Sequence, residues 1–294
     1  MDIRVLNYFL VVAQEENITK AAEILHTTQP NVSRQLAELE ERLGKKLFDR
    51  SRRKMTLTEE GLFLQKRAKE IVALVNRTEN ELTAFDQEAG GTVHIGAAET
   101  HTMRLLGDVM MALRQSHPQI GFDLFSGSTA EVTEQLGKGL LDFGVLVAPV
   151  DLGKYDYLTL PIKDTFGILT HCDSPLAKLA AVTPADLRHQ PVLVAKQQLE
   201  SNIFSGWLGG DIQHLNVVGT FNLITTPAML VESGLGSAFT FDKLVNTEGR
   251  NLCFRPLEPK VETALHLVWK KHQILPKPAK VFLARVKAMW AAEH

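Results

Sequence analysis

The most concentrated charge in the sequence lies near residue 50. Seven basic residues occur between Arg42 and Lys54, against the single acid Asp49. The protein as a whole is nearly neutral, with 32 Lys and Arg against 34 Asp and Glu and a net charge of −2. A local basic excess in a neutral protein is typical of a segment that contacts nucleic-acid phosphates. We therefore predict a basic hairpin, or wing, with its tip at residues 51–53.

A polar helix that could read DNA precedes this wing. Four apolar residues from Val32 to Leu43 recur at spacings of four, three and four, which predicts a helix with one buried stripe. Thr28 is placed to cap its start, and Gly44 is placed to end it. The opposite face carries Arg34 near its start, whereas the glutamates lie toward its end. We expect this helix to enter a DNA groove with its N-terminus first.

Two shorter helices are predicted before it. Apolar residues at 5–13 recur at helical spacing, and Thr19 can cap a second helix that packs through Ala21 and Ala22. Three short amphipathic helices could also form a bundle that binds another protein. The basic wing directly after the third helix favours DNA as the partner.

Several motifs then follow one another over about sixty residues, namely 17–23 (NITKAAE), 28–35 (TQPNVSRQ), 39–40 (LE), 43–44 (LG), 47–50 (LFDR) and 57–61 (LTEEG). Together they resemble the winged helix-turn-helix of LysR-type transcriptional regulators. The resemblance implies that the start of the third helix approaches base edges and that the wing contacts the backbone. Arg34 is the candidate for bidentate recognition of guanine. The predicted DNA-binding residues are Thr28, Gln29, Pro30, Asn31, Ser33, Arg34, Arg50, Arg52, Arg53 and Lys54.

A long helix is predicted from residue 59 to 89, with Thr58 as its cap and glycines at 90 and 91 as its end. Its apolar residues follow spacings of four and three, as in a coiled coil. A helix of about thirty residues spans roughly 45 Å, which is longer than a small domain needs. It could pack inside its own chain, but family resemblance favours pairing with a second copy and a pseudo-palindromic operator. The predicted dimerisation residues are Leu64, Ala68, Ile71, Val75, Leu82 and Phe85.

The sequence from 92 to 294 alternates short apolar strands with amphipathic helices, the pattern of an α/β fold. The motifs at 126–128 (SGS), 141–145 (LDFGV) and 232–236 (ESGLG) resemble the LysR effector domain, which has a two-lobed, type II periplasmic-binding-protein-like fold. The resemblance implies a first lobe at about 92–162 and 266–294 and a second at about 163–265. It also implies that a small molecule binds between the lobes.

Hydroxyl and amide side chains dominate the positions expected in that cleft. The candidates are Thr100, His101, Thr102, Ser126, Gly127, Ser128, Thr129, Lys196, Gln197, Gln198, Ser201, Asn222, Thr225 and Thr226. This composition predicts a polar effector and suits a carboxylate or another small anion, although Glu99 and Glu200 weaken the second inference. Many of these residues could instead cap helices or form turns.

The sequence offers no catalytic or metal-binding motif. The Gly-x-Gly at 234–236 lacks the third glycine of a dinucleotide site, and the histidines include no pair at metal spacing. Cys172 and Cys253 are too few for a disulfide framework and suit a reducing cytoplasm as inert thiols. We therefore expect no enzyme, no metal and no cofactor beyond the effector, and no membrane segment, since no apolar run reaches roughly 18 residues.

The sequence thus predicts a cytoplasmic, sequence-specific DNA-binding regulator of the LysR type that responds to a small effector. Its expected partners are operator DNA, a second copy of itself with a tetramer as an alternative, and RNA polymerase as a further candidate. A solute receptor and an enzyme acting on a small acid are the competing classes. A salt titration of DNA binding separates them, because only a regulator grips phosphates. The effector, the operator, and activation versus repression stay open.

Overall fold

A computed structural model describes residues 1–49, 54–84, 90–201, 203–210 and 212–291. The chain divides into two compact units, Met1–Thr83 and Ala84–His294, and each is described by itself. None of the helices in the described residues combines the length and hydropathy needed to cross a membrane. The α/β architecture preceded by an all-α unit with a wing is the fold class that the sequence predicts.

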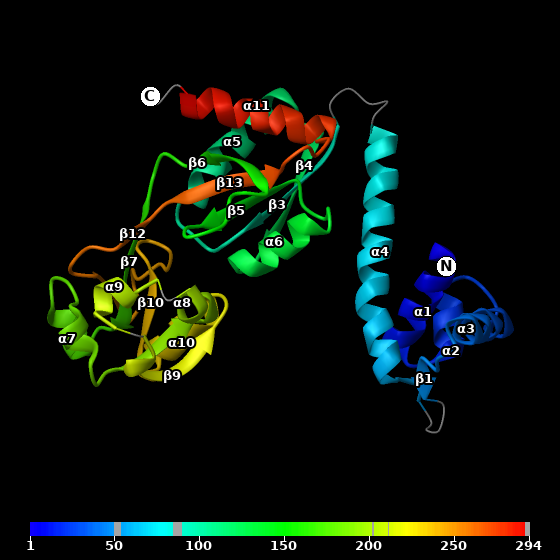
Figure 1. Ribbon diagram of the computed structural model, residues 1–294, viewed down its shortest axis with the longest axis horizontal. Helices are drawn as coiled ribbons and strands as arrows, with labels where there is room; N and C mark the ends of the chain where they lie inside the picture. Colours follow the sequence, from blue (N-terminus) through cyan, green and yellow to red (C-terminus); the bar gives the residue numbers. More distant parts are fainter. Residues whose placement is uncertain (50–53, 85–89, 202, 211, 292–294) are drawn as a thin grey trace. The chain divides into compact units, whose positions relative to one another are not determined.

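Three helices form the centre of the first unit, α1 (Ile3–Glu15), α2 (Ile18–Ile24) and α3 (Gln29–Leu43) (Figure 1). Their apolar faces meet in one core, in which Phe9, Val12, Val32 and Leu36 are fully buried. Gly44 ends α3 in the left-handed conformation, as predicted. Burial of these faces holds three helices that are too short to be stable alone.

The caps of α2 and α3 differ from the sequence prediction. Asn17, not Thr19, caps α2, because its side chain accepts a hydrogen bond from the Lys20 amide at 3.1 Å while Thr19 lies inside the helix. Thr28 holds the cap position of α3, but its hydroxyl makes no capping hydrogen bond. Asparagine caps as well as threonine does, so propensity alone did not separate the two candidates for α2.

The wing begins with β1 (Phe48–Asp49) and ends with β2 (Thr56–Leu57), which pair antiparallel. The long helix α4 (Glu59–Ala84) follows at once. Thr58 starts it as predicted, since its hydroxyl accepts the Gly61 amide at 3.0 Å. The predicted helix extends to 89, and residues 85–89 lie outside the described part of the chain.

The second unit contains two sheets, each the centre of one lobe. The first lobe has the strand order β4-β3-β5-β13-β6, in which β3 pairs parallel with β4 and β5 while β13 pairs antiparallel with β5 and β6. Its elements are β3 (Gly91–Ala97), α5 (Met103–Ser116), β4 (Ile120–Ser126), α6 (Thr129–Gly137), β5 (Phe143–Val147), β6 (Tyr155–Thr159), β13 (Leu265–Lys270) and α11 (Lys277–Ala291). The helices α5 and α11 pack together on one face of this sheet, and α6 covers the other (Figure 1).

The second lobe has the order β11-β7-β10-β8-β9, with β12 paired to the start of β7. Its elements are β7 (Asp164–His171), the 3-10 turn η1 (Pro175–Lys178), α7 (Pro184–Leu187), β8 (Pro191–Ala195), α8 (Lys196–Ser201), α9 (Ser205–Leu208), the 3-10 turn η2 (Ile212–His214), β9 (Asn216–Phe221), α10 (Thr225–Glu232), β10 (Ser237–Phe241), β11 (Leu252–Pro256) and β12 (Glu262–Thr263). The strands β6 and β11 both lie at a sheet edge and alternate weakly in burial, so their hydrophobic signal in the sequence is faint.

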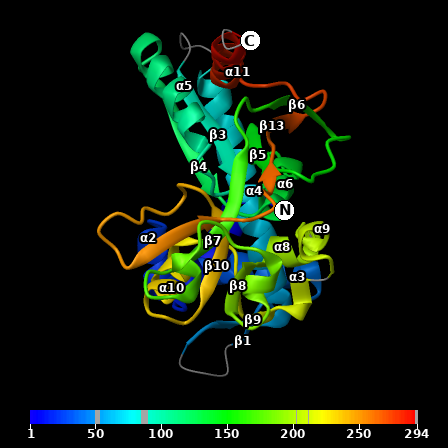
Figure 2. The same ribbon diagram turned by 90° about the vertical axis from the view of Figure 1, so that its left-hand side faces the viewer.

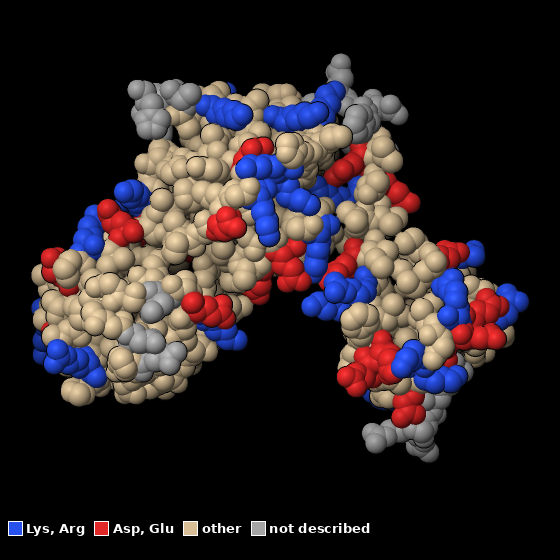
Figure 3. Space-filling view, in the orientation of Figure 1, with Lys and Arg blue, Asp and Glu red and all other residues tan. Residues whose placement is uncertain are grey.

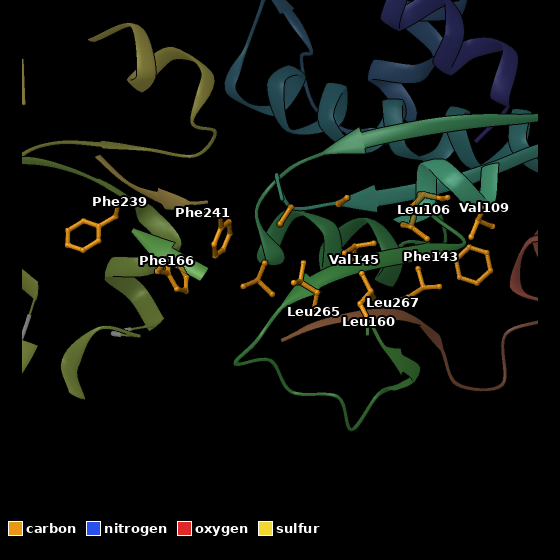
Figure 4. Close-up of a cluster of buried hydrophobic side chains, with 14 of the residues drawn as sticks. Leu106, Val109, Phe143, Val145, Leu160, Phe166, Phe239, Phe241, Leu265 and Leu267 are labelled. Carbon is orange, nitrogen blue, oxygen red and sulfur yellow. The ribbon is translucent and has the colours of Figure 1, made fainter. Parts of the chain in front are cut away.

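The chain crosses between the lobes twice, from β6 into β7 and from β12 into β13 (Figure 2). The two crossovers are tied together, because Glu262 and Thr263 pair with Thr165 and Asp164. One apolar cluster continues through both lobes, with Phe166 and Phe239 on one side and Val145 and Leu267 on the other (Figure 4). This continuous core and the paired crossovers place the lobes against each other and create the cleft between them.

Candidate functional site

The start of α3 presents polar groups to solvent. Thr28, Gln29, Pro30 and Arg34 are exposed, and no acid lies in the first turn of the helix. Arg34 donates to Asn31 Oδ1 at 3.3 Å, and its Nε lies 3.9 Å from Glu38 Oε1. The guanidinium is therefore held along the helix surface by weak, exposed contacts that a nucleic acid could replace. Asn31 and Ser33, also predicted to contact DNA, are half-buried.

The described part of the wing contributes Lys54. Its Nζ lies 2.9 Å from Glu16 Oε2 at the end of α1, and the lysine side chain is exposed. Arg50, Arg52 and Arg53 lie outside the described residues. Acidic and basic side chains are interspersed over the face of the first unit that Figure 3 shows. The acid-free start of α3 is the more specific feature.

Glu40, one of the glutamates toward the end of α3, supports the wing, a role that was not predicted from the sequence. It is 3% exposed, and its Oε1 accepts the amides of Leu47 at 2.8 Å and of Phe48 at 3.2 Å. Its Oε2 lies 3.4 Å from Lys46 Nζ. The carboxylate thus ties the end of α3 to β1. The sequence signal for its burial was its position four residues after Leu36, which places Glu40 at the edge of the apolar stripe of α3.

Some of the predicted dimerisation residues of α4 are buried in the first unit, and others are exposed. Leu64 and Ala68 are buried in the core of the helix-turn-helix unit, so the prediction that they face a second copy is wrong. Ile71 and Leu82 are exposed and Val75 is half-buried, whereas Phe85 lies outside the described residues. Three further exposed apolar residues, Leu62, Phe63 and Leu74, were missed. Helical spacing gave the direction of each side chain but could not say which face its own unit covers.

The cleft between the lobes holds a small pocket of about 80 Å³. Six of the predicted effector-binding residues line it, namely Gly127, Ser128, Gln197, Gln198, Ser201 and Asn222. Most of the remaining lining is apolar and includes Phe166, Phe221, Phe239 and Phe241. Apolar walls with a few polar groups are typical of a small-molecule site.

Thr100 and Thr102 have a different role from the one predicted. Both are buried, and both hydroxyls donate to the carboxylate of Asp164, with 2.5 Å between Thr102 Oγ1 and Asp164 Oδ1. Asp164 is the first residue of β7 and is 5% exposed. A buried carboxylate requires such donors. The two threonines therefore fix the crossover between the lobes, and neither lines the interlobe pocket.

The remaining candidates lie around the pocket rather than in its wall. His101 and Thr102 line a separate hollow of about 410 Å³ beside the crossover, and Thr100 and Ser126 line another of about 270 Å³. Lys196, Thr225 and Thr226 are exposed and do not line the pocket. The cation that the sequence analysis assigned to the cleft is therefore not part of the pocket wall.

Two sets of hydrogen bonds join the lobes beside the pocket. Gln197 Oε1 accepts the Thr129 amide at 3.1 Å, and its Nε2 donates to Thr129 Oγ1 at 2.8 Å. Glu99 Oε2 accepts the Ile224 amide at 2.7 Å, and the Thr225 hydroxyl lies 3.4 Å from Glu99 Oε1. Glu99 thereby occupies the N-terminus of α10, where backbone amides favour a negative charge. Thr129 and Thr225 thus contribute to closing the cleft.

The two cysteines lie together on neighbouring strands. Cys172 follows β7, Cys253 belongs to β11, and their Sγ atoms are 2.6 Å apart. The hydrogen bond with Cys253, followed by desolvation, raises the pKa of Cys172 above its ordinary value. A raised pKa leaves less of the nucleophilic thiolate. Within the described part of the chain, neither these cysteines nor any other His, Cys, Asp or Glu side chains form a group of three or more that could hold a metal ion.

Comparison with known proteins assigns both units. Residues 3–62 match the family model described as a bacterial regulatory helix-turn-helix protein of the lysR family, and residues 86–291 match the LysR substrate binding domain. The activator HcaR of the hca operon from Escherichia coli K12 is 30% identical over 94% of both chains. The uncharacterised HTH-type transcriptional regulator YvbU of Bacillus subtilis 168 is 27% identical over the full length of both.

Solved structures agree on the fold. The LysR family regulator CbnR superposes with a TM-score of 0.76 at 19% identity, covering 98% of this chain and 99% of CbnR. The full-length structure of CbnR with its target DNA gives a TM-score of 0.73 over the same shares of the two chains. The relatives are transcriptional regulators rather than enzymes or solute receptors. The chain belongs to the LysR family of DNA-binding transcriptional regulators, with an N-terminal helix-turn-helix and a C-terminal effector-binding domain.

Proposed function

We propose that this regulator reads its operator through the first two turns of α3 while the wing holds the DNA backbone. The observation that carries this assignment is the exposed, acid-free start of α3, where Gln29, Pro30 and Arg34 are accessible. Backbone amides and one guanidinium at a helix N-terminus suit a groove lined with phosphates. Thr28, Asn31 and Ser33 complete the base-facing set, and Arg50, Arg52, Arg53 and Lys54 supply the backbone contacts.

The test is a salt titration of operator binding by the full-length protein and by Arg34→Ala. Removing a bidentate contact to guanine should weaken specific binding by about 1–3 kcal/mol and relax the preference at one base pair. Arg114→Ala is the matched control, because Arg114 is an exposed arginine near the end of α5 in the other unit. Unchanged affinity and unchanged sequence preference for Arg34→Ala would remove this residue from the reading surface.

We further propose that α4 dimerises the regulator through its exposed apolar stripe. Phe63, Ile71, Leu74 and Leu82 are exposed along α4 and are not part of the buried core of the first unit. An apolar stripe of this length costs free energy while it faces water, and a second copy can cover it with the same stripe. A dimer also presents two α3 helices to two half-sites, which fits a pseudo-palindromic operator.

The effector-binding site in this proposal is the pocket between the lobes. It is supported by the polar residues gathered there, by the apolar walls, and by the hydrogen bonds that join the lobes around it. A molecule that binds one arrangement of the lobes more tightly than another shifts the balance between them. A cytoplasmic location, a tetramer and contact with RNA polymerase stay predictions.

A further inference from the structure

The charge inside the effector pocket is opposite to the one expected from the sequence. Among the described residues that line the pocket, Glu99 is the only charged one. Lys196, the cation expected there, is exposed and outside the wall. Among the described lining residues, a ligand carboxylate would therefore meet a fixed carboxylate and no cationic side chain. Two like charges in a partly desolvated site repel more strongly than they do in water.

Three backbone amides beside the pocket already have side-chain acceptors from the chain itself. Glu99 accepts the Ile224 amide at the start of α10. Gln197 accepts the Thr129 amide at the start of α6, and Gln198 accepts the Ala195 amide before α8 at 3.2 Å. All three acceptors line the pocket. To bind any of these three amides, an anion would have to displace its acceptor, and displacing Glu99 would also break a contact between the lobes.

The hydroxyl of Thr240, which has no hydrogen-bond partner in the described part of the chain, indicates which ligand groups the pocket can bind. Thr240 lines the pocket and is 4% exposed. A buried hydroxyl without a partner is costly unless a ligand or a water satisfies it. The aromatic walls formed by Phe166, Phe221 and Phe239 suit an apolar body.

We propose that Glu99 is a specificity-determining residue, and that the pocket selects an uncharged, largely apolar molecule with a hydroxyl or amide group over the corresponding carboxylic acid. This inference rests on the proposal that the interlobe pocket is the effector site. The amide or hydroxyl of the ligand donates toward the Glu99 carboxylate or bonds with Thr240, and its apolar body lies between the phenylalanines. The lobes remain joined through Glu99 when the ligand is bound.

The test compares benzamide with benzoate, two probes of nearly equal size that differ in charge. Binding of each to the full-length protein is followed by ligand-observed NMR titration. We expect benzamide to bind about tenfold more tightly than benzoate, because only benzoate meets the repulsion from Glu99. In Glu99→Gln, benzoate should gain affinity and the ratio should fall to about threefold or less, since the nearly isosteric amide keeps an acceptor for α10 without the charge.

Two further variants separate the possible failures. Glu200→Gln removes an exposed acid next to the pocket that does not line it, and it should leave the ratio unchanged. Ser201→Trp places a bulky ring at the pocket wall and should abolish benzamide binding. Benzoate preferred by the wild type, a ratio unchanged in Glu99→Gln, or no binding of either probe would overturn the role of Glu99. Benzamide binding that survives Ser201→Trp would instead overturn the pocket as the effector site.

Discussion

The two binding regions of this regulator are built in different ways. The DNA-reading surface comes from one short stretch, residues 28–54, in which a single helix and the wing after it supply every proposed contact. The effector pocket is lined by residues from Ala98 to Leu244, which come from both lobes. A contiguous site keeps its spacing in the sequence, because one helix fixes the direction of each side chain. A pocket formed by residues of two lobes has no regular spacing in the sequence from which its lining could be predicted.

The contiguous site nevertheless depends on one buried carboxylate, and its removal should give the largest effect. Glu40→Ala leaves the amides of Leu47 and Phe48 without their acceptor, so we expect the first unit to lose about 2–4 kcal/mol in free energy of unfolding. Thermal unfolding of the full chain measures this loss. Glu41→Ala, an exposed neighbour on the same helix, is the control. Equal melting curves for the two variants would show that the wing does not depend on Glu40.

The second prediction concerns the proposed dimer, in which two copies of the DNA-reading surface bind two half-sites. Leu74→Glu introduces a charge into the exposed stripe of α4, so we expect a monomer in sedimentation and roughly a hundredfold loss of operator affinity, since two linked half-sites no longer act together. Leu62→Glu is the matched control, because Leu62 is also exposed on α4 but lies about a third of a turn around the helix from Leu74. A Leu74→Glu variant that stays dimeric would exclude this stripe as the interface.

The smallest predicted effect lies in the second lobe and concerns pH. The hydrogen bond with Cys253 raises the pKa of Cys172, so less thiolate is present at neutral pH and alkylation by iodoacetamide should be slow although Cys172 is exposed. The rate should rise as the pH is raised. Cys253→Ala removes the first cause of the shift and should move the rate profile toward lower pH. Identical profiles for both proteins would mean that the neighbouring thiol does not control this reactivity.

The sequence was informative wherever one element carried the signal. The stripe from Val32 to Leu43 predicted α3, Gly44 predicted its end, and Thr58 predicted the start of α4. The alternation of strands and helices after residue 92 predicted the α/β fold. In each case the signal is a local spacing or a local backbone requirement that does not depend on distant residues.

The same reasoning failed where a side chain had more than one possible neighbour. Thr100 and Thr102 were expected to face a ligand, but their hydroxyls satisfy Asp164, which lies some sixty residues further along the chain. The sequence gives no sign of that pairing. Glu99 was noticed only as an unfavourable charge, yet it holds the start of α10 from the opposite lobe. Hydrogen-bond partners distant in sequence become visible only once the strands are placed.

The sequence by itself determined the family, the helix that can read DNA and the two-lobed α/β plan, because helix periodicity and turn residues are local properties of the chain. Only the tertiary structure decided which face of α4 its own unit covers, which hydroxyls are already bonded, and which charge lines the pocket. These depend on burial, and burial is set by packing between segments far apart in the sequence.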